Sequence, residues 1–155
     1  MDTFRNLPEE LILLDVEAED KEDLFVKVAA RLCMLGCVDD EYELVESLVD
    51  REEIMSTGIG LGVAFPHAEL SALSEGIVVI ARLKRPIKFG SLDRKPVDVA
   101  FVLLTPKGEH DQVLLILETL ARMIRDTKLL VGLRGAKDES EVQTTLKESR
   151  ERVYI

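Results

Sequence analysis

Residues 56–70, with the sequence STGIGLGVAFPHAEL, place a glycine-rich loop directly before a short apolar run. The stretch holds three glycines, a proline and one of only two histidines in the chain of 155 residues. The alternation of Val63 and Phe65 predicts a strand in which both side chains share one face. Because Pro66 fixes the backbone directly before His67, we expect this histidine on a rigid support at the end of the strand.

The sequence before this stretch predicts one strand and two amphipathic helices. The short apolar run at residues 11–18 is typical of a strand. Residues 20–36 repeat apolar side chains at helical spacing, between an acidic capping residue and a terminating glycine. A second helix is expected to begin at residue 39 or 40 and to end near Arg51, where a cation complements the helix dipole.

The sequence after this stretch predicts further strands and then helices. Residues 76–84 and 96–106 are nearly continuous apolar runs, as expected for strands in the middle of a sheet. Three helices are predicted to begin near residues 109, 126 and 138. Because strands and helices follow one another without a linker or an internal repeat, we expect a single α/β domain over residues 1–155.

The composition narrows the classes of partner. The formal net charge is −10, which argues against a nucleic-acid partner and against an anionic membrane surface. No run approaches the roughly 20 apolar residues of a membrane span. The acidic start of the sequence does not resemble a signal peptide, so we expect a cytoplasmic protein without membrane insertion.

Cys33 and Cys37 lack zinc-site spacing, and we expect both to be small buried side chains.

Several common site types do not match the glycine–proline–histidine stretch. Gly58, Gly60 and Gly62 form G-x-G-x-G, one residue short of the dinucleotide fingerprint, and they follow a predicted helix rather than a strand. The chain contains no G-K-[ST] loop, no H-E-x-x-H pair and no G-x-S-x-G elbow. We therefore expect neither a metal nor a cofactor.

A lone histidine can instead act as a nucleophile toward phosphorus, because one imidazole nitrogen is unprotonated at neutral pH. Such a site needs donors for the phosphate oxygens, and Ser56, Thr57 and the three glycines are the candidates for a phosphate-binding loop. It also needs a cation to offset the charge of the transferred group, and Arg51 is nearby in the sequence. These features fit a structural histidine beside a turn about equally well.

The segment REEIMSTGIGLGVAFPH, residues 51–67, resembles the signature of the enzyme IIA domains of the bacterial sugar phosphotransferase system, fructose/mannitol type. The likeness continues through RPIKFGSLDRKPVDVAFVLLTP, residues 85–106, which is especially similar to the nitrogen-regulatory branch. LLILETLARMIRD, residues 114–126, and LRGAKDESEV, residues 133–142, are similar to the C-terminal helices of the family. The resemblance implies a mixed β-sheet flanked by helices on both faces.

The resemblance also implies roles for two residues. His67 matches the histidine that receives a phosphoryl group from the carrier protein HPr, and Arg51 matches the arginine beside it. In sugar transporters the group then passes to a IIB domain, whereas in nitrogen-regulatory members the phosphorylation state controls which target proteins are bound. The implied activity is that of a histidine phosphotransferase, a phosphoryl carrier.

One position departs from the family pattern. Family members carry a second active-site histidine in the helix that follows residue 106, and Val113 occupies the matching position. His110 lies three residues earlier, about one helical turn away. It either takes over this role or is an ordinary exposed histidine at a helix start. Without a second imidazole, the alternative function is a non-catalytic module that controls a transporter or a transcription system.

Overall fold

The two long apolar runs of the sequence form the central strands β5 (Ile77–Ile87) and β6 (Val97–Pro106) of a six-stranded sheet. The computed structural model describes residue 4 and residues 6–154. β5 and β6 pair antiparallel, and β1 (Ile12–Val16) lies parallel to β5 on its other side. Most side chains of β6 are buried because helices cover both faces of the sheet, as predicted from its continuous apolar run.

The other side of β6 carries two short strands in succession. β3 (Val63–Ala64) and β4 (His67–Leu70) both run parallel to β6, and β2 (Gly58–Gly60) pairs antiparallel with β3. The expectation that His67 ends a single strand is therefore wrong, since His67 begins β4. The break falls at Pro66, which has no N–H for the ladder but accepts a hydrogen bond from the Leu103 N–H at 2.9 Å.

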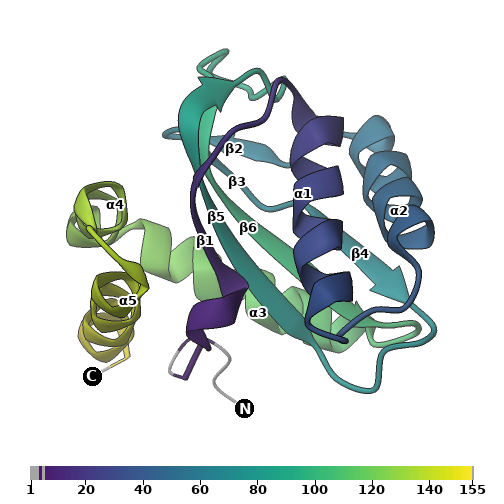
Figure 1. Cartoon of the computed structure of the whole chain (residues 1–155). Helices are drawn as coiled ribbons and strands as arrows, with labels where there is room; N and C mark the ends of the chain where they lie inside the picture. Colours follow the sequence, from purple (N-terminus) through teal and green to yellow (C-terminus); the bar gives the residue numbers. More distant parts are fainter. Residues whose placement is uncertain (1–3, 5, 155) are drawn as a thin grey trace.

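Helices cover both faces of this mixed sheet (Figure 1), which confirms the predicted α/β architecture. One hydrophobic cluster joins the sheet to the first two helices, and a second cluster on the opposite face joins it to the last three. The helices are α1 (Lys21–Met34), α2 (Glu41–Ile54), α3 (His110–Ile124), α4 (Thr127–Gly135) and α5 (Glu139–Val153), and a short 3-10 helix (Glu9–Leu11) precedes β1.

Four of the five helices in the described part of the chain begin at an aspartate that caps them. The carboxylate of Asp20, for example, accepts a hydrogen bond from the Asp23 N–H at 2.8 Å. The helix starts predicted from these acids are confirmed. α3 is the exception, because its N-cap Glu109 makes no side-chain capping bond and the helix opens with His110.

The end of α1 corrects the expectation for the two cysteines. Gly36 has a φ of +75°, and the N–H groups of Gly36 and Cys37 donate to the Cys33 and Leu32 carbonyls. This Schellman motif ends the helix and leaves Cys37 outside its apolar stripe. Cys37 is therefore exposed and Cys33 only half-buried.

Candidate functional site

His67 is held at the junction between β3 and β4. Its ring Nδ1 lies 2.9 Å from the carbonyl oxygen of Phe65, two residues earlier in the chain. A carbonyl oxygen only accepts hydrogen bonds, so Nδ1 carries the proton. The imidazole is half-buried, with Pro66 buried behind it and the strand register with β6 holding its backbone.

Arg51 reaches His67 from the last turn of α2. Its Nε–H donates to His67 Nε2 at 3.1 Å, and its Nη1 donates to the Met55 carbonyl at 2.9 Å. The second bond anchors the guanidinium at the end of the helix, where carbonyl groups lack helical partners. Because an arginine nitrogen only donates, His67 Nε2 is unprotonated. The arginine and histidine that the sequence singled out are therefore in direct contact.

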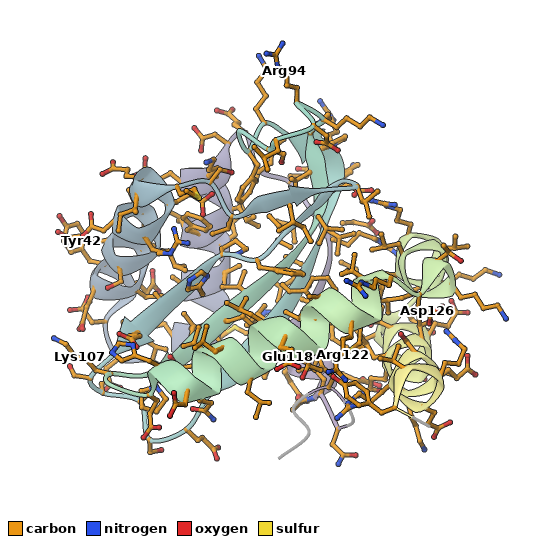
Figure 2. All side chains as sticks on the ribbon, turned by 180° about the vertical axis from the view of Figure 1, so that it is seen from behind. Tyr42, Arg94, Lys107, Glu118, Arg122 and Asp126 are labelled. Carbon is orange, nitrogen blue, oxygen red and sulfur yellow. The ribbon has the colours of Figure 1, made fainter. Side chains whose placement is uncertain are left out.

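An open pocket of about 580 Å³ contains both residues. It is bounded by the C-terminal half of α2, by β4, and by the connection from β6 into α3. Figure 2 shows Lys107 in this connection, at the end of the sheet beside the start of α3. The lining comprises Ser47, Asp50, Arg51, Ile54, His67, Ala68, Glu69, Lys107, His110, Val113 and Leu114.

The structure also brings His110 into this pocket. His110 Nδ1 lies 2.8 Å from Oε1 of Glu69, and its side chain is 76% exposed. Val113, at the position of the family's second histidine, lies one turn further along α3 and lines the same pocket. The helix face toward His67 thus presents an imidazole from its first residue and an apolar side chain where the second histidine of the family would stand.

The glycine-rich loop lies outside the lining of this pocket. The buried carboxylate of Glu52 accepts from the Thr57 N–H at 2.8 Å and from the Thr57 hydroxyl at 2.7 Å. Ser56 donates its hydroxyl to the Phe89 carbonyl and accepts from the Gly58 N–H at 3.1 Å. The role of Ser56, Thr57 and the glycines as a phosphate cradle stays a prediction, and this geometry does not support it.

The glycines of the loop are required by close approach and by backbone conformation. A Cβ on Gly58 would lie 2.1 Å from the Ser91 hydroxyl oxygen. Gly62 has a φ of +77°, and a Cβ there would lie 2.6 Å from Nη2 of Arg134 and 2.8 Å from Oδ1 of Asp98. Gly60, with a φ of +94°, turns β2 toward β3. These positions need glycine for packing and turning, whatever else the loop does.

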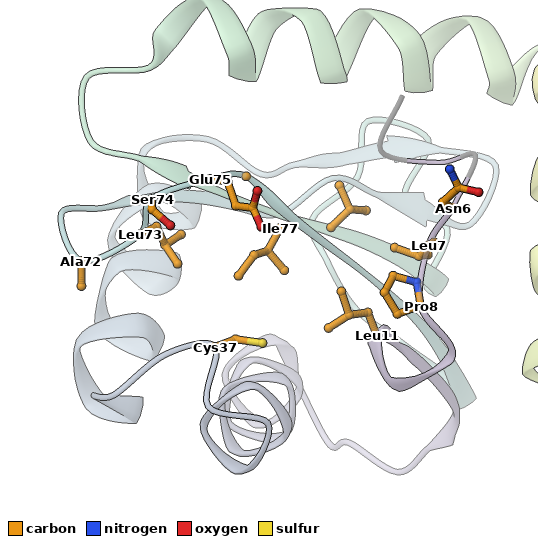
Figure 3. A pocket seen from close by; sticks show the side chains of 12 residues that line it. Asn6, Leu7, Pro8, Leu11, Cys37, Ala72, Leu73, Ser74, Glu75 and Ile77 are labelled. Carbon is orange, nitrogen blue, oxygen red and sulfur yellow. The ribbon is translucent and has the colours of Figure 1, made fainter. Parts of the chain in front are cut away.

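A second cavity of about 500 Å³ lies where the N-terminal segment meets the loop before β5 (Figure 3). Leu7, Leu11, Leu73 and Ile77 give it mainly apolar walls, and Cys37 faces it from the turn after α1.

The described residues contain no cluster of three or more His, Cys, Asp or Glu side chains that could hold a metal ion. None of the helices in the described ranges is long and apolar enough to cross a membrane.

The sequence patterns did not point to Lys107 or Asp50, which both line the His67 pocket. Lys107 reaches the pocket because β4 and β6 run parallel, so that their C-terminal ends meet at one edge of the sheet. That pairing joins residues 36 positions apart, such as His67 and Leu103, and has no local signature. Asp50 has a weak signal, since it precedes Arg51 on an exposed helix end.

Known proteins match this chain over most of its length. The family model described as phosphoenolpyruvate-dependent sugar phosphotransferase system, EIIA 2, matches residues 5–149. A nitrogen regulatory protein of Bradyrhizobium diazoefficiens is 35% identical over 137 residues, which cover 88% of this chain and 89% of the relative. A fructose-specific EIIA component of Haloferax volcanii is 32% identical over 141 residues, covering 91% of this chain and 92% of the relative.

A solved structure agrees with the sequence relatives. The crystal structure of the nitrogen regulatory protein IIA-Ntr from Neisseria meningitidis is similar with a TM-score of 0.83 and 29% sequence identity. The similarity covers 90% of this chain and 94% of that chain. The likeness therefore extends over the sheet and the helices on both of its faces.

Proposed function

This chain belongs to the EIIA 2 family of phosphoryl carriers in the phosphoenolpyruvate-dependent sugar phosphotransferase system, and we propose that His67 is the residue that accepts the phosphoryl group. The observation that carries this assignment is the pair of hydrogen bonds on its ring. The Phe65 carbonyl fixes the proton on Nδ1, and the Arg51 Nε–H marks Nε2 as the nitrogen with a free electron pair.

The proposed step is a displacement at phosphorus. The Nε2 electron pair forms the new N–P bond, while the N–P bond of the donor's phosphohistidine breaks and returns its electron pair to the donor imidazole. The Nδ1 proton of His67 stays in place, and the Phe65 carbonyl supports the positive charge that develops on the ring. No proton has to leave His67, so positioning and electrostatics account for the protein's contribution.

Arg51 has a defined role in this step. Its bond to Nε2 must open for the attack, and the freed guanidinium is then within reach of the phosphoryl oxygens bound to the same nitrogen. Its anchor on the Met55 carbonyl keeps it at the pocket while this bond opens. Lys107 adds a second cation to the lining, which offsets the charge of the incoming group.

We propose HPr as the phosphoryl donor and, as the next partner, a IIB domain or a regulated target protein, in the cytoplasm. The family implies the donor and both routes onward, and the nitrogen regulatory names of relatives support the regulatory route. We further propose that residues 1–155 form one IIA domain, which the continuous sheet and its two hydrophobic clusters support. His110 belongs to the proposed site because it lines the same pocket as His67.

The test is phosphorylation by the purified relay. The protein is incubated with labelled phosphoenolpyruvate, enzyme I and HPr, and the expected product carries an acid-labile, base-stable phosphate, as a phosphohistidine does. His67→Ala and His67→Gln should abolish the label, while His110→Gln should still accept it because His110 is not the nucleophile. Peptide mapping should place the label on His67.

The same experiment can contradict the assignment of His67 as the phosphoryl acceptor. A wild-type protein that stays unlabelled while HPr is labelled would overturn the assignment. It would favour the alternative of a non-catalytic module, for which the specific observation is Val113 at the second histidine position. A label that persists in His67→Gln would place the nucleophile elsewhere.

A further inference from the structure

We propose that Glu69 and His110 act as one unit that sets the charge of the phosphoryl pocket, with His110 as a positioning residue that neutralises Glu69 rather than a second imidazole on the phosphoryl group. This inference rests on the proposed function of His67. It is carried by the contact of 2.8 Å between His110 Nδ1 and Glu69 Oε1, which joins β4 to the first residue of α3.

Glu69 places a negative charge beside the nucleophile. Side chains alternate along a strand, so Glu69 lies on the same face of β4 as His67, about 7 Å further along at two residues' rise. Both side chains are half-buried, whereas Ala68 and Leu70 between and after them are buried toward the core. A carboxylate in this position opposes the arrival of a phosphoryl group at His67.

His110 is the group that offsets this charge. Its side chain is 76% exposed, so packing does little to hold it, and its N-cap neighbour Glu109 makes no side-chain capping bond. When the imidazole is protonated, the contact of 2.8 Å is an ion pair with the buried oxygen Oε1 of Glu69, and it holds the carboxylate on the α3 side of the pocket. The imidazole of His110 is therefore paired with Glu69.

The pairing of His110 with Glu69 affects the net charge of the pocket. The lining holds two acids, Asp50 and Glu69, and two permanent cations, Arg51 and Lys107. Apart from the nucleophile His67, His110 is therefore the group in the lining whose charge decides whether the pocket is balanced or positive. Val113 adds no charge on the next turn of α3, so the second imidazole of the family is replaced by an imidazole–carboxylate pair.

The test is a double-mutant cycle on the rate of phosphoryl transfer from phospho-HPr. We expect His110→Gln to slow transfer about tenfold or more, because Glu69 then lacks its partner in the pocket. Glu69→Gln should exceed the wild-type rate, because it removes the carboxylate that opposes the incoming phosphoryl group. The double variant should return to within about threefold of wild type, because removing the carboxylate removes the need for His110.

Two outcomes would overturn the inference. If the double variant is as slow as His110→Gln, the imidazole acts on the phosphoryl group directly. If His110→Gln transfers at the wild-type rate, the ion pair is only a surface contact.

Glu109→Gln serves as the matched control, because it removes an exposed acid beside His110 that is not in the pocket lining, and it should not rescue His110→Gln.

A second measurement separates this inference from the proposed function. Binding of inorganic phosphate to the four proteins of the cycle, followed by NMR of the His67 ring, reports the charge of the pocket without any transfer. His110→Gln should weaken phosphate binding and the double variant should restore it. If the wild type shows this binding pattern but is not labelled by phospho-HPr, the carrier function is rejected and the inference about Glu69 and His110 stands. If all four proteins bind phosphate equally, the inference that His110 neutralises Glu69 is rejected.

Discussion

The glycine loop and the histidine pocket are adjacent in the sequence but use their polar groups in opposite ways. In the loop, Thr57 and Ser56 bond to Glu52 and to the Phe89 carbonyl inside the protein. In the pocket, His67 and Arg51 bond to each other at the wall of an open cavity. A motif that looks continuous in the sequence thus separates into one part that builds the fold and one part that is available for chemistry.

Burial follows the same division. Glu52 and Thr57 are buried, with 7% and 6% of their surface exposed, and Lys21 completes the Glu52 site with an ion pair at 3.1 Å. At the pocket, Ile54 is 80% and Leu114 is 64% exposed. Substitutions in the loop should therefore change the free energy of unfolding, whereas substitutions in the pocket should change the rate of transfer and leave stability nearly unchanged.

Among substitutions that leave the nucleophile His67 in place, the largest effect on the pocket side is expected from Arg51→Gln. The variant loses the charge that faces the phosphoryl group, and the rate of transfer from phospho-HPr should fall about 100-fold to 1,000-fold. The free energy of unfolding should change by less than about 1 kcal/mol, because the guanidinium is only half-buried and its bond to the Met55 carbonyl is exposed. Rapid-quench kinetics and urea denaturation measure the two quantities on the same preparation.

Arg125→Gln is the control for Arg51→Gln, because it removes an exposed arginine at the far end of α3. It should leave both the transfer rate and the stability at wild-type values. A wild-type transfer rate in Arg51→Gln would contradict the division between loop and pocket, because it would show that the pocket cation takes no part in phosphoryl transfer.

The largest effect on the loop side is expected from Gly58→Ala. The added Cβ would lie 2.1 Å from Oγ and 3.1 Å from Cβ of Ser91, which is itself buried. Overpacking of this kind should lower the free energy of unfolding by about 3 kcal/mol, measured by urea denaturation. The transfer rate per folded molecule should stay at the wild-type value, because Gly58 does not line the His67 pocket.

Two variants sharpen the Gly58→Ala result. Ser91→Ala removes the hydroxyl oxygen that the new methyl group meets, so the double variant should regain part of the lost stability. Gly135→Ala is the matched control, because a Cβ at Gly135 has open space around it and should change stability little. A loss of transfer activity in folded Gly58→Ala would show that the loop takes part in the chemistry.

The parts of this fold that the sequence predicted are those with local causes. The helix starts at Asp20, Asp40, Asp126 and Asp138 follow from capping chemistry within three residues. The central strands follow from continuous apolar runs, which are typical of a sheet covered on both faces. The contact between Arg51 and His67 came from the family resemblance, which carries information about distance that a single sequence otherwise lacks.

The parts that the sequence did not predict depend on strand pairing. Glu69 and His110 meet because β4 pairs in parallel with β6 and α3 starts just after β6 ends. The glycines of the loop looked like a phosphate cradle because the same residue type serves close packing and anion binding. Only the positions of Glu52 and Ser91 distinguish the two uses here, and neither residue lies inside the loop.

The smallest effect is expected from Thr57→Val, and this variant decides between the two uses of the loop. Valine keeps the shape of the side chain and removes the hydroxyl that donates to Glu52 Oε2 at 2.7 Å. The free energy of unfolding should fall by about 2 kcal/mol, because the lost hydrogen bond is donated to a buried carboxylate. If the hydroxyl serves only the fold, the transfer rate from phospho-HPr should stay within about twofold of wild type.

Thr144→Val is the control for Thr57→Val, because it makes the same chemical change at an exposed position of α5 and should alter stability by less than about 0.5 kcal/mol. A tenfold or greater loss of transfer in Thr57→Val, measured at temperatures where it is fully folded, would assign the hydroxyl to the phosphoryl group. The phosphate would then have to displace Glu52 from Thr57, and the division between a loop for the fold and a pocket for the chemistry would no longer hold.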